Sequence, residues 1–155
     1  MNFLADLYRR DLSRLTQQIE GFRNDEMLWQ SLPGISNSAG ALVLHLEGNL
    51  REYIGRQLGQ VSYVRNRPLE FTANNIERKE LLRRVTELSI LIPSTIESLS
   101  QEAMEREYPE AVLGRALTTG AFLIHLYGHL NWHLGQLDYL RRILSGEGAI
   151  ARAAL

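Results

Sequence analysis

Three of the four histidines of this chain stand at intervals of four residues in the segment "HLYGHLNWHLGQ", as His125, His129 and His133. Histidines at positions i and i+4 of a helix lie on one face, where two imidazoles can share one metal ion, as in H-E-x-x-H sites. One ion would have difficulty reaching all three, because the outer two are about 12 Å apart along a helix axis. The spacing therefore predicts a metal-binding pair and not a triplet.

A helical wheel indicates which two histidines form the pair. His129 and His133 fall in the middle of an apolar face, whereas His125 falls at its edge and is expected to be half-exposed or to lie behind the ligands. A buried imidazole without a partner is costly, so something must satisfy both rings of the pair. The alternative is that the two histidines are structural and bind no metal, which is the more common role of a lone pair on a helix.

The remaining histidine, His45 in "LVLHLEGN", is the candidate for a third ligand from another helix. Its position at the border of that helix's apolar face suits a ligand at the mouth of a pocket. Three neutral imidazoles leave positions on the ion for water or substrate, as in catalytic rather than closed structural sites.

Four further residues are candidates to line a pocket at this site: Asn49, Glu52, Tyr53 and Gln136. Gln136 follows His133 by nearly one turn and could hydrogen-bond a ligand or a substrate. Each of the four also fits an ordinary capping or surface role. None is a convincing general base, so the catalytic residues stay unassigned.

Four amphipathic helices must position these residues. Apolar residues recur at spacings of three and four over residues 4–22, 38–58, 76–99 and 120–145, with Ser38 and either Thr118 or Thr119 as N-caps and a stop before "GEG". The segments between them are rich in Gly, Pro, Asn and Ser, and strand signals are weak. The expected fold class is all-α, a four-helix bundle with long connecting loops. Pro93, inside the third helix, is expected to kink or break it.

The composition narrows the possible functions. The 155 residues are expected to form one domain, with residues 146–155 as a loosely attached tail. Seventeen Lys and Arg against 18 Asp and Glu give no support to a nucleic-acid partner. The chain has no cysteine, so a thiol nucleophile would have to come from a cosubstrate. Neither a signal peptide nor a membrane span is recognisable, which makes the cytoplasm the expected location.

The sequence resembles the DinB/YfiT-like superfamily of small metal-dependent proteins. The segment "HLNWHLGQLDYLRRIL" is similar to its H-x-x-x-H-x-G-Q signature in the last helix, and "SNSAGALVLHLEGNL" to its ligand-bearing second helix. A weaker similarity to one branch lies in "YVRNRPLEF". The resemblance extends from the first helix to about residue 145. It implies a four-helix bundle in which His45, His129 and His133 hold a divalent transition metal, with zinc and nickel as the first candidates.

The resemblance also implies what such a site does. Some relatives transfer a low-molecular-weight thiol, and many form homodimers. The leading hypothesis is an enzyme that transfers a thiol cosubstrate to a small electrophilic substrate, or that hydrolyses a small substrate. Two alternatives stay open: a non-catalytic metal-binding bundle that acts as a sensor or binding module, and a structural or dimerising helical protein without metal. A homodimer surface could come from the segment "DEMLWQSLPGI" and from exposed tyrosines.

Overall fold

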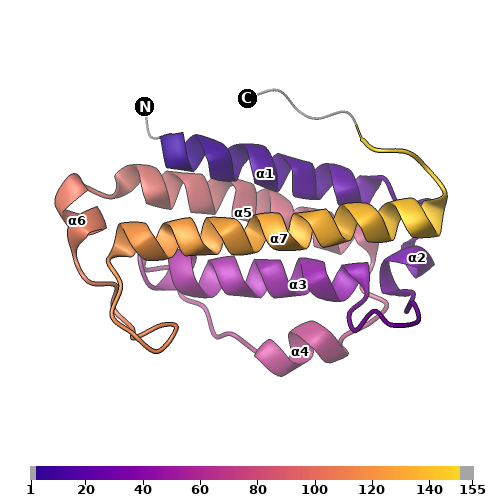
Figure 1. The fold of residues 1–155 in the computed structure, drawn as a ribbon, viewed down its shortest axis with the longest axis horizontal. Coiled ribbons are helices and arrows are strands. Elements are labelled where there is room, and N and C mark those ends of the chain that lie inside the picture. Colours follow the sequence, from indigo (N-terminus) through magenta and orange to yellow (C-terminus); the bar gives the residue numbers. More distant parts are fainter. Residues whose placement is uncertain (1–2, 151–155) are drawn as a thin grey trace.

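Four long helices form the bundle, as the periodicity predicted (Figure 1). They belong to a computed structural model that describes residues 3–150. Within that range the structure has no strand, only two isolated β-bridges, so the all-α fold class is confirmed. The helices are α1 (Phe3–Glu20), α3 (Ala39–Leu50) with its extension η1 (Arg51–Arg56), α5 (Arg78–Ser98) and α7 (Thr119–Ser145).

The ends of the two helices that carry the histidines are fixed by local side-chain and backbone chemistry. Ser38 caps α3 by accepting from the backbone N–H of Ala41, and Thr118 caps α7 by accepting from that of Ala121. Helix α7 ends at Gly146, whose positive φ of 67° is a left-handed conformation that glycine adopts without a steric penalty. These caps confirm the predicted starts and the predicted stop.

The connections are more ordered than their composition indicated. Short helices occupy parts of all three: α2 (Asp25–Trp29), α4 (Arg67–Thr72) and α6 (Gln101–Glu105). Each begins at a polar N-cap that composition alone reads as a loop residue, namely Asn24, Asn66 and Ser100. Of the three, α4 makes the most extensive contact with α3, the helix that carries His45.

Two features of the long helices differ from the expectation. A π-helix, η1, continues α3 from Arg51, and π-helical turns inside longer helices are frequent at functional sites. Of the kink or break expected at Pro93, a break does not occur, because α5 runs without interruption from Arg78 to Ser98. Pro93 is buried, so its ring packs in the core, and this packing offsets the hydrogen bond that proline cannot donate.

Helix α7 contacts both α1 and α3, and this explains the width of its buried face. Leu123, Leu130 and Leu137 are fully buried and mark the middle of that face. On one side, Tyr127 donates its hydroxyl hydrogen to the buried Asp11 of α1. On the other side, His129 and His133 turn towards α3.

The described part of the C-terminal tail packs back on the helices. Arg141, which is buried in α7, donates to the backbone oxygen of Gly148, and Arg23 pairs with Glu147. The remainder of the predicted tail, residues 151–155, lies outside the described residues. None of the helices within residues 3–150 combines the length and the apolar character that a membrane span requires.

A candidate metal centre between two helices

The structure brings His45 of α3 together with His129 and His133 of α7. The Nε2 atom of His129 lies 3.2 Å from that of His45 and 3.1 Å from that of His133. One nitrogen of each ring belongs to a group whose members all lie within 4.8 Å of one another. The two imidazoles of α7 and a third from more than eighty residues earlier in the chain thus bring their Nε2 atoms to one small volume.

Two details of this placement correct the sequence-based expectation. His129 and His133 are half-buried and not central, because the centre of the broad buried face of α7 holds leucines. His45 is not at a border but buried, at 7% exposure, since every residue of α3 is buried beneath α4, α5 and α7. The histidines therefore lie where α7 leaves the core and meets α3.

Glu70 of α4 is a site residue that the sequence analysis did not identify. It is 6% exposed, and its Oε2 lies 2.9 Å from Nδ1 of His45. Arg65 holds the same carboxylate through two hydrogen bonds, Nε to Oε1 at 2.6 Å and Nη2 to Oε2 at 2.9 Å. Both residues belong to "YVRNRPLEF", a segment in which the sequence showed a weaker family similarity but no candidate site residue. The signal that points to Glu70 is the need of a metal-binding imidazole for an acceptor at its other nitrogen.

Gly48 makes room for that carboxylate. A Cβ atom at position 48 would lie 2.2 Å from Oε1 of Glu70 and 2.9 Å from its Cδ, closer than atoms can approach. Helix α4 can therefore place its glutamate against α3 only where α3 carries a glycine. The sequence "HLEG", His45 to Gly48, thus contains both the imidazole and the gap for its acceptor.

The hydrogen bonds at Nδ1 of His45 and His133 determine that the Nε2 atoms of these two rings are unprotonated and direct their lone pairs at the centre of the cluster. A carboxylate only accepts, so His45 donates from Nδ1 to Glu70 and presents an unprotonated Nε2. Nδ1 of His133 lies 2.7 Å from Oε1 of Gln136. An amide oxygen also only accepts, so His133 likewise donates from Nδ1 and presents an unprotonated Nε2. Nε2 of His129 can donate to only one of these two lone pairs, so three neutral rings leave one contact unmade.

A divalent cation at the centre would satisfy all three nitrogens. Imidazole nitrogens that bind one zinc ion at about 2.0–2.1 Å in tetrahedral geometry are about 3.3 Å apart, close to the separations of 3.1 and 3.2 Å. Metal-bound histidines usually donate their other ring N–H to an acceptor, and Glu70 and Gln136 are such acceptors for His45 and His133. The residues present fit a metal ion on donor type, spacing and hydrogen bonding.

Burial keeps the rings available as ligands. It lowers the pKa of His129 to about 4, with the positive charge that His133 and His45 would carry as a further cause. Burial also lowers the pKa of His45, although Glu70 opposes that shift. Both rings are therefore neutral at neutral pH, the form in which histidine binds metals.

A pocket of about 400 Å³ lies beside the cluster, between α3 and α7. His45 and His129 form part of its wall, and so do three of the residues that the sequence singled out: Asn49, Tyr53 and His125. His125 is exposed and stacks on Phe122, and it lies outside the histidine cluster.

Glu52 does not line this pocket. It stands about two turns beyond His45 along the helix, and its carboxylate accepts from Arg56 at 2.8 Å. The wheel placed it close to His45 in angle but took no account of this distance along the axis.

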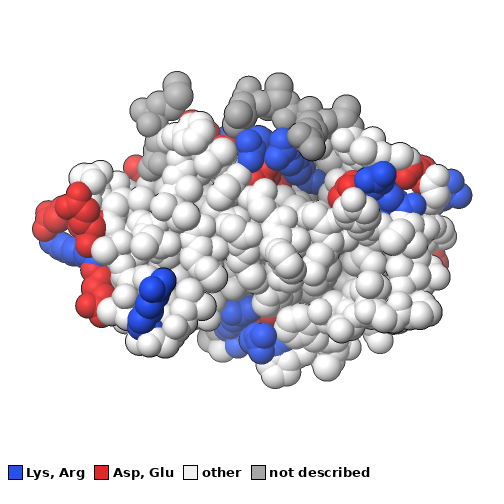
Figure 2. Space-filling model, viewed as in Figure 1, with Lys and Arg blue, Asp and Glu red and all other residues white. Residues whose placement is uncertain are grey.

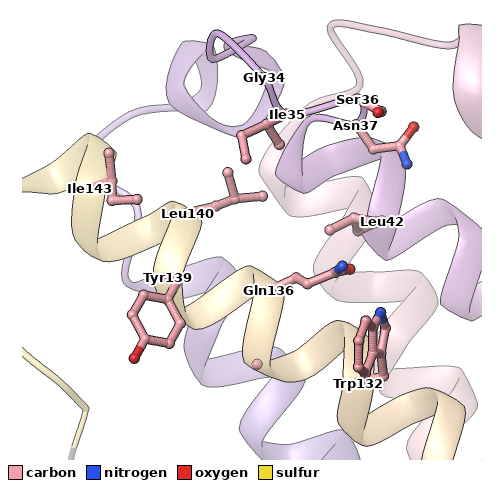
Figure 3. A pocket seen from close by; sticks show the side chains of 11 residues that line it. Gly34, Ile35, Ser36, Asn37, Leu42, Trp132, Gln136, Tyr139, Leu140 and Ile143 are labelled. Carbon is pink, nitrogen blue, oxygen red and sulfur yellow. The ribbon is translucent and has the colours of Figure 1, made fainter.

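A second pocket, of about 530 Å³, lies between α7 and the segment that leads into α3, and Gln136 forms part of its wall (Figure 3). Ile35, Leu42 and Leu140 point into it, and the Gln136 side chain lies between Leu42 and Trp132. Gln136 thus has one face towards His133 and the other towards an apolar hollow. The predicted role of Gln136 beside the histidines agrees with this geometry.

Solved structures share this fold. A DinB-like protein from Bacillus cereus superposes with a TM-score of 0.74 at 15% identity, covering 96% of this chain and 94% of that one. A DinB-like protein from Bacillus subtilis gives 0.74 at 16% identity, covering 97% and 98%. A conserved protein from Enterococcus faecalis gives 0.74 at 15%, covering 94% and 96%. At these identities the likeness establishes the fold.

The sequence itself places the chain in a family. No curated protein matches it. The family described as "Protein of unknown function (DUF1572)" matches residues 4–151, nearly the whole chain. Together with the DinB-like structures, this match confirms the resemblance to the DinB/YfiT-like proteins. The chain belongs to the DUF1572 family and has the DinB-like fold.

Proposed function

We propose that this protein is a metal-dependent enzyme in which His45, His129 and His133 hold a divalent transition ion, zinc or nickel. The observation that carries the proposal is the convergence of three Nε2 atoms while Glu70 and Gln136 hold the outer nitrogens of two rings. Three imidazole ligands leave coordination positions open, and a pocket adjoins two of them. We place this activity in the cytoplasm because neither a signal peptide nor a membrane span is recognisable in the sequence.

The reaction that best suits the site is transfer of a low-molecular-weight thiol to a small electrophile, or hydrolysis of a small substrate. A bound divalent ion supplies Lewis-acid chemistry and lowers the pKa of a thiol or a water. Glu70 and Gln136 hold the protons on Nδ1 of His45 and His133, so that the lone pairs stay directed at the centre. Arg65 keeps Glu70 in position. The thiol comes from a cosubstrate, since the chain has no cysteine.

One observation favours the second candidate function, a non-catalytic metal-binding module. Among the residues that line the pocket, Glu110 is the single carboxylate, and Arg56 and Gln57 both donate to it. Glu70 is likewise engaged by Arg65 and His45. A general base is therefore not evident in the pocket wall, and in this alternative the ion contributes folding energy only.

Metal analysis with a matched pair of variants tests the proposal. Protein purified without a histidine tag is expected to contain about one transition ion per chain, and His133→Ala is expected to lose it. His125→Ala, an exposed histidine of the same helix, should keep it. Metal-dependent conjugation of a small thiol to a reporter electrophile would then favour the enzyme over the binding module. Wild-type protein without metal, or metal content unaffected by His133→Ala, would refute the metal site.

We also propose that the protein forms a homodimer through the outer face of α7. Trp132, Tyr139 and Ile143 are between 62% and 69% exposed on this face, which carries few charges (Figure 2). Ile35, from the segment predicted to supply a dimer surface, lines the same hollow (Figure 3). Of the six tyrosines, Tyr139 is exposed, and the other five are buried or half-buried, so Tyr139 is the exposed tyrosine that we assign to this surface. In a two-fold symmetric dimer the exposed indole of each chain can pack into the apolar hollow of the other, so the same contact forms twice.

Light scattering after size exclusion tests the dimer. The wild type is expected to elute with the mass of two chains, and Trp132→Asp with the mass of one. Ile90→Asp is the matched control, because Ile90 is 69% exposed but lies on α5. A monomeric wild type at micromolar concentration would contradict the proposal.

A further inference from the structure

The pocket beside the histidines has a polar wall that the metal ligands do not explain. Asn49 follows His45 by one helical turn and lines the same pocket. Its side chain is 8% exposed, and its Oδ1 has no hydrogen-bond partner. A buried acceptor without a donor costs free energy that a leucine at this position would not.

A second unpartnered polar atom lies in the same wall. Nδ1 of His129 is buried and has no partner. These two atoms are half of the four buried side-chain polar atoms without a partner in the described part of the chain, and both belong to residues that line one pocket. Native proteins leave few such atoms unpaired, so their presence together indicates that a polar ligand enters this pocket.

The mouth of the pocket carries a positive charge that no carboxylate balances. Arg67 is exposed, lies over the ring of Phe71 at 5.5 Å, and forms no ion pair within residues 3–150. The neighbouring Arg65 is engaged by Glu70. Glu110, the carboxylate of the wall, is held by Arg56 and Gln57. Arg67 is therefore the cation available to an entering molecule.

We propose that this pocket binds a small carboxylate that also carries a hydroxyl or amine group. The carboxylate pairs with Arg67 at the mouth, and the hydroxyl or amine donates to Oδ1 of Asn49 inside. An arginine fork matches a carboxylate, and a buried amide oxygen accepts only from a donor. The inference deepens the proposed function by naming its substrate class. It rests on that function only in placing the reacting bond beside the histidines.

Calorimetric titration with simple probes tests the two contacts separately. The probes are γ-hydroxybutyrate and ε-hydroxycaproate, with butyrate and caproate as matched acids without a donor and the corresponding diols as matched molecules without a charge. Two chain lengths are used so that one can span from Arg67 to Asn49. At the better length, the hydroxy acid is expected to bind at least about tenfold tighter than either matched molecule.

Two variants assign the preference to residues. Arg67→Gln should abolish the preference for the hydroxy acid over the diol, whereas Lys79→Gln, which removes an exposed cation from α5, should leave it unchanged. Asn49→Leu should abolish the preference over the plain acid, and it should raise the melting temperature of the free protein because an unpaired buried acceptor is removed. Equal binding of acids and diols at both lengths, or hydroxy-acid binding unaffected by Arg67→Gln, would overturn the inference.

The same titrations on protein stripped of metal separate this inference from the proposed function. Binding that depends on Arg67 and Asn49 is expected with and without metal, since neither residue belongs to the histidine cluster. Protein that takes up no metal but still selects hydroxy acids would refute the proposed function and leave this inference standing. Protein that takes up metal but does not select hydroxy acids would refute this inference and leave the proposed function standing.

Discussion

At the scale of single residues, the orientation of His45 depends on Glu70. The imidazole could present either nitrogen to the cluster, and the carboxylate at 2.9 Å from Nδ1 selects Nε2. The sequence alone identified His129 and His133 because the i, i+4 spacing and the H-x-x-x-H-x-G-Q pattern are local, and it proposed His45 because it is the remaining histidine, in a segment similar to the family's ligand-bearing second helix. It could not identify Glu70, because the approach of α4 to α3 depends on a turn and a glycine twenty-two residues away.

Glu70→Gln is the sharpest test of this orientation. The amide still offers one acceptor, but its NH₂ group then meets either the donating Nδ1 of His45 or the guanidinium of Arg65. We expect metal affinity to fall about 10- to 100-fold, the usual effect of losing a partner behind a metal ligand. Competition with a chromogenic chelator measures it. Glu26→Gln, at an exposed glutamate of α2, is the control, and equal affinities of the two variants would contradict the role assigned to Glu70.

At the scale of helices, the long elements were predictable and their mutual placement was not. The caps at Ser38 and Thr118 and the stop at Gly146 are encoded within a few residues, and the structure confirms them. Pro93 does not break α5 because tertiary packing offsets its cost, and no local pattern contains that packing. The wheel also failed to place His45 and the centre of α7, since burial depends on how many neighbours cover a helix.

Gly48 tests the contact between α3 and α4 directly. In Gly48→Ala the new methyl group would overlap the Glu70 carboxylate, so α4 must move away from His45. We expect a loss of metal affinity and a lower free energy of unfolding, although alanine has the higher intrinsic helix propensity. Gly128→Ala in α7 is the matched control, because nothing lies within 4 Å of a Cβ atom there. That variant should gain up to about 1 kcal/mol. Chemical denaturation and metal titration of both proteins separate helix propensity from the clash, and a Gly48→Ala protein that behaves like Gly128→Ala would refute it.

At the scale of the whole molecule, the histidine cluster and its hydrogen-bond partners bring into contact segments that are far apart in the sequence. His45 comes from the second long helix and His129 from the last, while Glu70 adds α4 from the connection between the second and third (Figure 1). An ion bound here cannot be held in the same way by the unfolded chain, since these residues converge only in the fold. Metal binding must therefore stabilise the native bundle.

Removing the metal should accordingly lower the melting temperature. A ligand at 100 times its dissociation constant stabilises the native state by about 2.7 kcal/mol, which for a chain of this size shifts the midpoint by roughly 5–10 °C. Thermal unfolding followed by circular dichroism, with and without a chelator, measures the shift. His133→Ala should unfold at one temperature under both conditions, whereas His125→Ala should retain the wild-type shift. A chelator effect of equal size in the His133→Ala protein would mean that the ion binds elsewhere, because the α7 pair would then contribute nothing to its affinity.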